Sequence, residues 1–248
     1  MKTKLLQTIL FVCGLCLAPM AFAIPFATPE NNAKTLNANY IELADQLKNN
    51  QFKRPLYLNS EESSDNLKGV IYAVVNHSFT KVNTALNNPE HWCDVLILHI
   101  NIKYCQASSD KNGTMLNVNL GKKYDQPLED TSRVEFNYRE MINSSDYFAI
   151  QLNAEEGPLG TSDYRIWIES TPLKDGQTFL HFTYTYSFGL SGHIAMKTYL
   201  ATIGRDKVGF TASDKQTNGR PDYIQGVRGV VERNTMRYQR FDLTAEQG

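Results

Sequence analysis

The sequence predicts an α+β fold in which a long helix near the C-terminus closes over a concave antiparallel sheet of about seven strands. Three observations support this prediction. Apolar and polar residues alternate from Thr178 to Phe188, as in a strand with one buried face, and the apolar set is largely aromatic. Beyond Gly189 the apolar spacing becomes helical. Several similar alternating segments are separated by short turns, which favour antiparallel neighbours.

The first 23 residues are expected to be an export signal and not part of the fold. Lys2 and Lys4 precede an apolar run over residues 5–17, and Ala21-Phe22-Ala23 fits an A-x-A cleavage pattern. The mature chain would begin at Ile24 and be periplasmic or secreted. The apolar run is shorter than the roughly 20 residues needed to span a bilayer, so a membrane-spanning segment is not expected.

Residues 24–66 are expected to form an N-terminal helical extension. Leu36, Tyr40, Leu43 and Leu47 lie at helical spacing there. A short apolar piece at residues 56–58 and a polar stretch at residues 59–66 follow. The run over residues 67–75, rich in β-branched residues, is then expected to be the first main strand.

Cys93 and Cys105 are expected to form a disulfide, because an exported chain enters a compartment that permits one. The alternative is two buried free thiols. One continuous strand would separate the two residues by about 40 Å at ~3.3 Å per residue, too far to bridge. We therefore expect a helix from about Pro89, a reversal near residues 99–101 and a return strand from Ile102. The bridge would join that helix to the strand after it.

The later elements follow from alternation and turn residues. A short helix is expected through Val82 and Leu86, before the one that starts near Pro89. Further strands are expected over residues 116–120, 134–138, 148–152, 164–168 and 178–188. Residues 67–205 would form the main domain. Residues 206–248 would be a polar loop to Gly226 and a final amphipathic helix, from Val227 to Phe241, packed on that domain.

Charge excludes one large class of function. Without Lys2 and Lys4 the chain has 23 basic residues, from 25, against 26 acidic ones, so its formal charge is −3. The charges are scattered along the chain. A nucleic-acid-binding protein would need a clustered basic surface, so no nucleic-acid partner is expected.

From Leu67 to Arg205 the chain resembles the START and Bet v 1-like group of helix-grip proteins, the SRPBCC superfamily of polyketide cyclases and lipid-transfer domains. The resemblance is carried by the order of the elements and by the segments HSFTKVNTALNNPEHW and FLHFTYTYSFGLSGHIAMKTYL. The segments WCDVLILHINIKYC, GRDKVGF and GVRGVVERNTMRY are also similar to exported proteobacterial proteins of this kind. The resemblance implies a curved sheet that wraps a long C-terminal helix and encloses a cavity for an apolar ligand.

A ligand site is predicted between the inner sheet face and the helix that follows residue 189. Its residues are Tyr138, Tyr164, Phe182, Tyr184, Tyr186, Met196 and Tyr199. Phenol hydroxyls would bond a polar head group, as the few polar groups of an apolar pocket do. Small residues on the helix, Gly192 among them, would leave space unfilled. The alternative is that the tyrosines are core or rim aromatics whose hydroxyls reach water or backbone.

The preferred function is a non-catalytic exported START-like binding protein for a lipid or other hydrophobic small molecule, with transient membrane contact. One alternative is a cyclase-like or hydrolytic enzyme that uses a tyrosine or Glu140 as acid or base. Another is a protein-interaction domain with a filled core. The histidines fit no zinc motif, and no nucleophile elbow, P-loop or dinucleotide fingerprint is present. No cofactor or metal is expected, and Glu232 beside Arg233 is expected to be solvated or in a structural ion pair.

Overall fold

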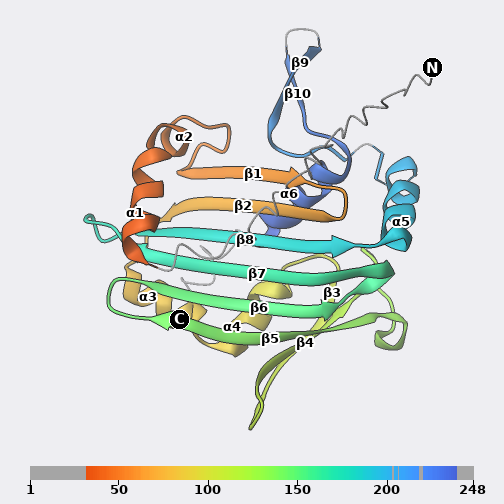
Figure 1. Ribbon diagram of the computed structural model, residues 1–248, viewed down its shortest axis with the longest axis horizontal. Coiled ribbons are helices and arrows are strands. Elements are labelled where there is room, and N and C mark those ends of the chain that lie inside the picture. Colours follow the sequence, from red (N-terminus) through yellow and green to blue (C-terminus); the bar gives the residue numbers. More distant parts are fainter. Residues whose placement is uncertain (1–31, 203, 206, 218–219, 239–248) are drawn as a thin grey trace, which may run out of the picture.

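The structure, a computed structural model, describes residues 32–202, 204–205, 207–217 and 220–238 (Figure 1). The expected export signal and Phe241 therefore lie outside the described residues. The main feature of the fold is an eight-stranded sheet in the order β1-β2-β8-β7-β6-β5-β4-β3. No helix within the described ranges has the length and apolar character needed to cross a bilayer.

Every neighbouring pair of strands in this sheet is antiparallel. The strands are β1 (Leu56–Glu62), β2 (Asn66–Val75), β3 (Ile102–Asp110), β4 (Gly113–Leu120), β5 (Ser132–Asn143), β6 (Phe148–Glu156), β7 (Thr161–Pro172) and β8 (Thr178–Phe188). The pair β2–β8 joins an early strand of the sequence to the last strand of the sheet, with Ile71 opposite Phe182.

The sheet has one strand more than expected, because β1 extends the apolar piece at residues 56–58 through polar residues up to Glu62. Residues 24–66 are therefore not a purely helical extension. Polar side chains suit this position, since β1 is an edge strand and its backbone still bonds to β2.

The helices are α1 (Ala33–Glu42), α2 (Ala44–Lys48), α3 (Phe79–Leu86), α4 (Pro89–Leu96), α5 (Leu190–Ala201) and α6 (Gly226–Tyr238), with 3₁₀ turns η1 (Leu128–Asp130) and η2 (Pro158–Gly160). Side-chain caps fix where three of them begin. Asn32, Ser78 and Asn88 accept bonds from backbone N–H groups in the first turns of α1, α3 and α4.

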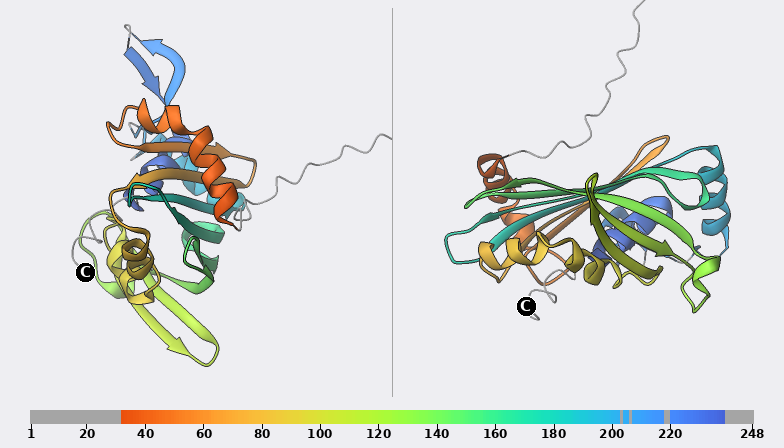
Figure 2. Two further views of the ribbon diagram at one scale, coloured as in Figure 1. Left: turned by 90° about the vertical axis from the view of Figure 1, so that its left-hand side faces the viewer. Right: turned by 90° about the horizontal axis from the view of Figure 1, so that it is seen from below.

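The two faces of the sheet are covered by different helices. Helices α3, α4 and α6 lie on its concave side, whereas α1 lies on the opposite side at one end (Figure 2). The larger core fills the concave side, where Trp92 of α4 and Val231 of α6 are buried with the inward strand residues. A smaller core on the convex side joins Leu36 and Leu47 to Trp167 and Phe179. The amphipathic N-terminal and C-terminal helices are thus both confirmed as packed elements.

The disulfide is present between Cys93 of α4 and Cys105 of β3, whose Cα atoms are 5.2 Å apart. A turn over residues 97–101 reverses the chain between them. The expected helix, reversal and return strand are confirmed, and so is the bridge between them.

Of the two helices that follow the last strand of the large sheet, α6 lies on the concave side and α5 does not, whereas the helix after residue 189 was expected there. Helix α5 lies at one end of the sheet (Figures 1 and 2), and Leu190 and Ile194 on it are 79% and 59% exposed. Its apolar residues point in all directions, so their spacing defines no buried face. A Cβ added to Gly192 would lie 2.9 Å from the Cβ of Phe188 and 3.1 Å from the carbonyl oxygen of Gly160. This glycine therefore permits close packing and does not leave space for a ligand.

Helix α6 approaches the sheet closely over β2. A Cβ added to Gly69 would lie 2.1 Å from Oγ1 of Thr235 on α6. Glu232 of the same helix is fully buried and not solvated. Its carboxylate accepts bonds from Oγ of Ser60 at 2.7 Å and from the backbone N–H groups of Phe210 and Thr211 at 2.6 and 2.9 Å. These contacts join α6 to β1 and to residues 210–211, which directly precede a strand that begins at Ala212.

The stretch before α6 was expected to be a loop, but it contains the two-stranded antiparallel hairpin β9 (Ala212–Thr217) and β10 (Arg220–Tyr223). The hairpin projects from the sheet (Figure 1). A half-buried strand is predicted from alternating apolar and polar residues. The sequence of the hairpin is polar and has no such alternation. The expectation of a loop was wrong for that reason.

Candidate functional site

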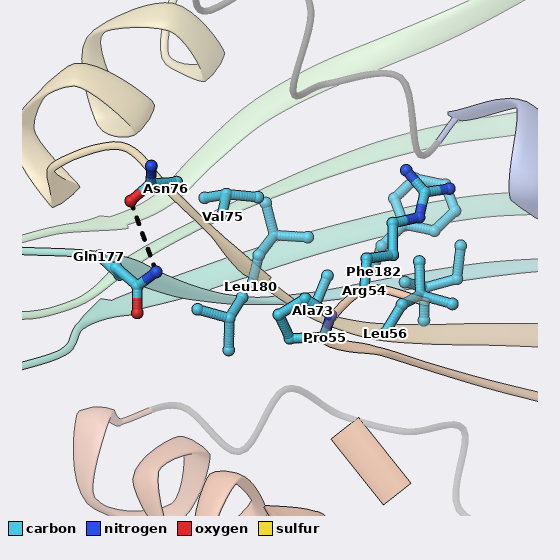
Figure 3. Close-up of a pocket in the computed structure, with 11 residues that line it drawn as sticks. Arg54, Pro55, Leu56, Ala73, Val75, Asn76, Gln177, Leu180 and Phe182 are labelled. Carbon is cyan, nitrogen blue, oxygen red and sulfur yellow. Dashed lines mark hydrogen bonds between the residues drawn. The ribbon is translucent and has the colours of Figure 1, made fainter. Parts of the chain in front are cut away.

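A cavity of about 370 Å³ opens on the concave side where β1, β2 and β8 run side by side (Figure 3). We call it the groove. Its lining residues are Arg54, Pro55, Leu56, Ile71, Ala73, Val74, Val75, Asn76, Gln177, Leu180 and Phe182. Most of these side chains are apolar, which is typical of small-molecule sites.

Strand register explains why the groove is apolar and why it is not filled. Leu56 on β1 pairs with Ala73 on β2, and Ala73 pairs with Leu180 on β8. Paired residues point to the same face, so the three side chains form one row. Ala73 is the short member of that row. Its methyl group leaves room between two leucines, and the next row contributes Ile71 and Phe182.

Polar groups stand at both ends of the groove. In Figure 3, Asn76 and Gln177 lie at the end nearest Val75, and Nε2 of Gln177 donates to Oδ1 of Asn76 at 3.5 Å. Arg54 lies toward the opposite end, with Leu56. Among the described residues that line the groove there is one charged side chain, Arg54, and neither a carboxylate nor a histidine.

Of the predicted ligand-binding residues, Phe182 lines the groove. The four predicted tyrosines on the sheet face the concave side and are buried, as expected. Tyr164 stacks on Tyr186 with ring centroids 5.3 Å apart, and Tyr184 lies 5.6 Å from Tyr186. These three rings pack against one another in the core, and none of them lines the groove. The tyrosines are thus core aromatics, as in the alternative interpretation, but the hydroxyls of Tyr138 and Tyr164 bond to the side chains of Asn87 and Thr161 and not, as that interpretation had it, to water or backbone.

Burial also governs the chemistry of these phenols. It raises the pKa of Tyr138, with the charge of Glu140 as a second cause. It raises the pKa of Tyr186, with Tyr164 and Glu62 adding to the effect. Burial also raises the pKa of Tyr164, although the hydrogen bond with Thr161 acts to lower it. Each phenol therefore keeps its proton, and Tyr138 donates to Oδ1 of Asn87 at 3.2 Å.

Met196 and Tyr199 are half-buried on α5 at the end of the sheet and are not among the groove residues. Nζ of Lys207 lies 4.8 Å from the ring centroid of Tyr199. Glu140 is exposed and accepts a bond from Nδ2 of Asn143 at 3.1 Å. The structure thus does not bring Met196, Tyr199 or Glu140 to the groove.

A buried polar network on the convex face was not predicted. Nδ1 of His181 lies 2.6 Å from Oε1 of Glu169, and the Tyr147 hydroxyl donates to Oε2 of the same carboxylate. Nε2 of His181 lies 3.0 Å from Oγ1 of Thr183, and Tyr72 stacks on the imidazole at 4.2 Å. Although a hydroxyl, an imidazole and a carboxylate follow one another here, all three are buried and outside the groove. We assign the network to structure, because buried charges need such partners.

A second cavity, of about 600 Å³, lies between α3 and the turn that joins β5 to β6. Its lining is mainly amide and hydroxyl side chains: Phe79, Thr80, Asn83, Thr84, Asn87, Asn88, His91, Asn143, Ser144 and Ser145. Nδ2 of Asn83 donates to Oδ1 of Asn143 at 2.8 Å across it. Within the described part of the chain, no three His, Cys, Asp or Glu side chains are grouped so as to hold a metal ion.

The large antiparallel sheet wraps a C-terminal helix. The fold is a helix grip. No protein-family model matches the chain, and no curated protein matches it either. Solved structures similar to it include a norcoclaurine synthase point mutant from Thalictrum flavum, at 16% identity over 55% of this chain and 86% of that one, with a TM-score of 0.39.

Two further similar structures are Ara h 8.0201 and human StAR-related lipid transfer protein 5. The first is 9% identical over 78% of this chain and 99% of that one, with a TM-score of 0.40. The second is 8% identical over 87% and 96%, with a TM-score of 0.41. At these TM-scores the likeness supports no conclusion about the superfamily, the ligand or the activity of this chain.

Proposed function

We propose that this protein is an exported binding protein that holds a lipid or another hydrophobic small molecule in the groove without transforming it. The observation that carries the proposal is the groove itself, an apolar depression of about 370 Å³ with a few polar groups at its ends. Such a composition suits a ligand whose apolar part leaves water and whose polar part is held at one position. The START and Bet v 1-like resemblance of the sequence implies the same class of ligand.

The groove is a better candidate than the tyrosine cluster for a physical reason. Tyr164, Tyr184 and Tyr186 already contact one another, so a ligand among them would have to displace packed rings. The acid or base considered for an enzyme, Glu140, is exposed and is not a groove residue. These placements favour a binding protein over a cyclase or hydrolase.

The test is binding of a neutral apolar fluorophore, N-phenyl-1-naphthylamine, to wild-type protein and to Val75→Trp. Val75 is half-buried and lines the groove, so the larger side chain should fill it and reduce binding about tenfold or more. Ala195→Trp is the matched control, because Ala195 lies on α5 outside the groove, and its binding should stay unchanged. Thermal unfolding of both variants reports whether they remain folded.

Two outcomes would contradict the proposal. One is a wild-type protein that binds no apolar probe and yields no extractable lipid when purified from its source. The other is a folded Val75→Trp protein that binds as well as wild type. In either case the interaction domain with a filled core would become the better description.

Export and membrane contact are separate parts of the proposal. Export predicts that the mature protein begins at Ile24 in a periplasmic or secreted fraction, which N-terminal sequencing checks. Membrane contact is proposed at the end of the molecule where Leu190 and Ile194 of α5 and Leu159 of η2 are exposed. Apolar residues that stay exposed together mark such surfaces. Ile194→Lys should then reduce co-sedimentation with phospholipid vesicles, and an unchanged pellet fraction would argue against this surface.

A further inference from the structure

We propose that the second cavity, between α3 and the turn that joins β5 to β6, binds a neutral carbohydrate of one or two sugar rings. This inference goes beyond the proposed function and does not depend on it, because the cavity shares no described lining residue with the groove. A sugar offers many hydroxyl groups and no formal charge. The walls of the cavity are suited to both properties.

The composition of the walls is the first argument. Nine of the ten described lining residues carry an amide, a hydroxyl or an imidazole, and none carries a carboxylate, an ammonium or a guanidinium group. Thr80, Asn83 and Thr84 share one side of α3, because they lie three or four residues apart. The solvated face of a helix usually carries charged residues, whereas the side of α3 that lines the cavity has none.

Unused amide groups are the second argument. The side-chain oxygen of Asn87 accepts a bond from the hydroxyl of Tyr138 at 3.2 Å, and that of Asn88 accepts one from the backbone N–H of Glu90 at 3.0 Å. The amide nitrogen of each side chain can donate two bonds, and neither nitrogen has an acceptor among the described residues. Each amide is therefore oriented by the protein and still able to donate to a ligand.

The cavity offers acceptors as well as donors. Nδ1 of His91 lies 2.9 Å from the carbonyl oxygen of Ala85, so in the neutral imidazole it carries the proton and Nε2 is an acceptor. The hydroxyls of Thr80, Thr84 and Ser145 can each donate and accept, and no other described residue bonds to them. Sugar hydroxyls also donate and accept, so a carbohydrate can pair with such a mixed surface.

The wall opposite α3 is already ordered. Oδ1 of Asn143 accepts a bond from Nδ2 of Asn83 at 2.8 Å, and Nδ2 of Asn143 donates to Glu140 at 3.1 Å. Oγ of Ser144 donates to Oδ1 of Asp146 at 2.9 Å. An ordered wall loses less conformational entropy when a ligand binds. The two carboxylates beside this wall would repel an anion, which favours a neutral ligand.

The volume of the cavity limits the size of the ligand. About 600 Å³ holds on the order of 20 non-hydrogen atoms, if each takes about the 30 Å³ of a liquid water molecule. This is enough room for one or two sugar rings. The affinity is expected to be modest, because the bonds to the protein replace bonds that the sugar makes to water.

The experiment measures binding of three neutral disaccharides, maltose, cellobiose and N,N′-diacetylchitobiose, by ligand-observed saturation-transfer NMR. At least one should bind wild-type protein, and the anionic sugar glucose 6-phosphate should not. Ser145→Trp should fill the cavity and weaken binding about tenfold or more. Thr84→Val should weaken it about fivefold, the factor that the loss of one hydrogen bond of about 1 kcal/mol produces.

Each variant has a matched control. Ser64→Trp places the same side chain in the exposed turn between β1 and β2, and Thr198→Val removes an exposed hydroxyl from α5. Neither residue lines the cavity, so both variants should bind as wild type does. Thermal unfolding reports whether all four variants remain folded.

Four outcomes would overturn the inference. Wild-type protein could bind none of the three disaccharides, or it could bind glucose 6-phosphate as tightly as the best of them. A folded Ser145→Trp or Thr84→Val protein could bind with unchanged affinity. Finally, the sugar could displace N-phenyl-1-naphthylamine, which would place it in the groove. Binding of this fluorophore without any sugar reports on the proposed function separately.

Discussion

His99 is buried between two groups that can only donate hydrogen bonds. Its Nδ1 lies 3.2 Å from the backbone nitrogen of Asn101, and its Nε2 lies 3.3 Å from Nη1 of Arg237 on α6. Burial, and after it the charge of Arg237, lower the pKa of His99 to about 4, although a hydrogen bond with Asn234 acts in the opposite direction. The folded protein therefore holds this imidazole neutral under conditions where an unfolded chain would protonate it.

This shift predicts how stability depends on pH. Between about pH 6.5 and pH 4 the unfolded chain binds a proton at His99 that the folded chain does not, so stability falls as pH decreases through this window. The contribution is about 3 kcal/mol at most. Replacing His99 by Asn should flatten the difference between urea midpoints at pH 7 and pH 5. The exposed His91→Gln is the control, and an equal flattening there would count against His99 as the source.

Removing the carboxylate of Glu232 from α6 is expected to destabilise the fold strongly. Glu232→Ala would leave the hydroxyl of Ser60 and the backbone N–H groups of Phe210 and Thr211 without their present acceptor. Losing charge-assisted bonds to buried donors should lower the free energy of unfolding by about 3 kcal/mol. Urea denaturation measures this loss. A change below about 0.5 kcal/mol, typical of surface sites, would contradict the assigned role.

At the level of residues, the sequence predicted which side chains face inward but not which of them meet. Alternation places Tyr184 and Phe182 on one face whatever the partner strand is. The partners of His181 and Ala73 depend on strand register, which the spacing of a single strand does not contain. The Glu169–His181 pair and the row that forms the groove could not be predicted for this reason.

The link between α4 and β3 can be tested through the disulfide. Cys93 and Cys105 are 12 residues apart in sequence, and closing a loop of this size should stabilise the protein by roughly 3 kcal/mol. Reduced protein, or a Cys93→Ala/Cys105→Ala double variant, should unfold at correspondingly lower urea. Alkylation of denatured, unreduced protein should find no free thiol at these positions, and two labelled thiols would disprove the bridge.

Helix α6 should be indispensable because it covers the concave side of the sheet. Ending the chain at Gly226 removes Val231, which is fully buried in the larger core, and uncovers apolar residues of β1 and β2. The truncated protein should bind a hydrophobic dye and aggregate. If its melting temperature and solubility matched those of the full chain, α6 would not be part of the core.

Elements with one apolar face were predicted and those without one were not. The N-terminal helix, α4, β8 and α6 each have a periodic apolar pattern and form where expected, although the N-terminal helix is divided at Leu43 into α1 and α2. Helix α5 has no single apolar face, the sequence of the β9 and β10 hairpin is mostly polar, and half of β1 is polar. Backbone pairing determines the strands among these elements, and the room at the end of the sheet determines where α5 lies. Neither cause produces a local pattern in the sequence.

At the scale of the whole molecule, a hydrophobic ligand bound in the groove should stabilise the fold, because it binds the assembled strands and not the unfolded chain. N-phenyl-1-naphthylamine at 100 times its dissociation constant should add about 2.7 kcal/mol to the free energy of unfolding. Val75→Trp, with the groove filled, should show no such gain. An equal gain in both proteins would place the ligand elsewhere.

The contact between Gly69 and Thr235 has a consequence for redesign of this protein. The side chains at positions 69 and 235 together set the distance between helix and sheet, because the hydroxyl of Thr235 lies where a Cβ on Gly69 would be. Gly69→Ala should push the helix outward, and the double change with Thr235→Gly should let it return. Positions 69 and 235 both lie outside the groove lining. Substitutions there would let an engineer adjust the volume between α6 and the sheet.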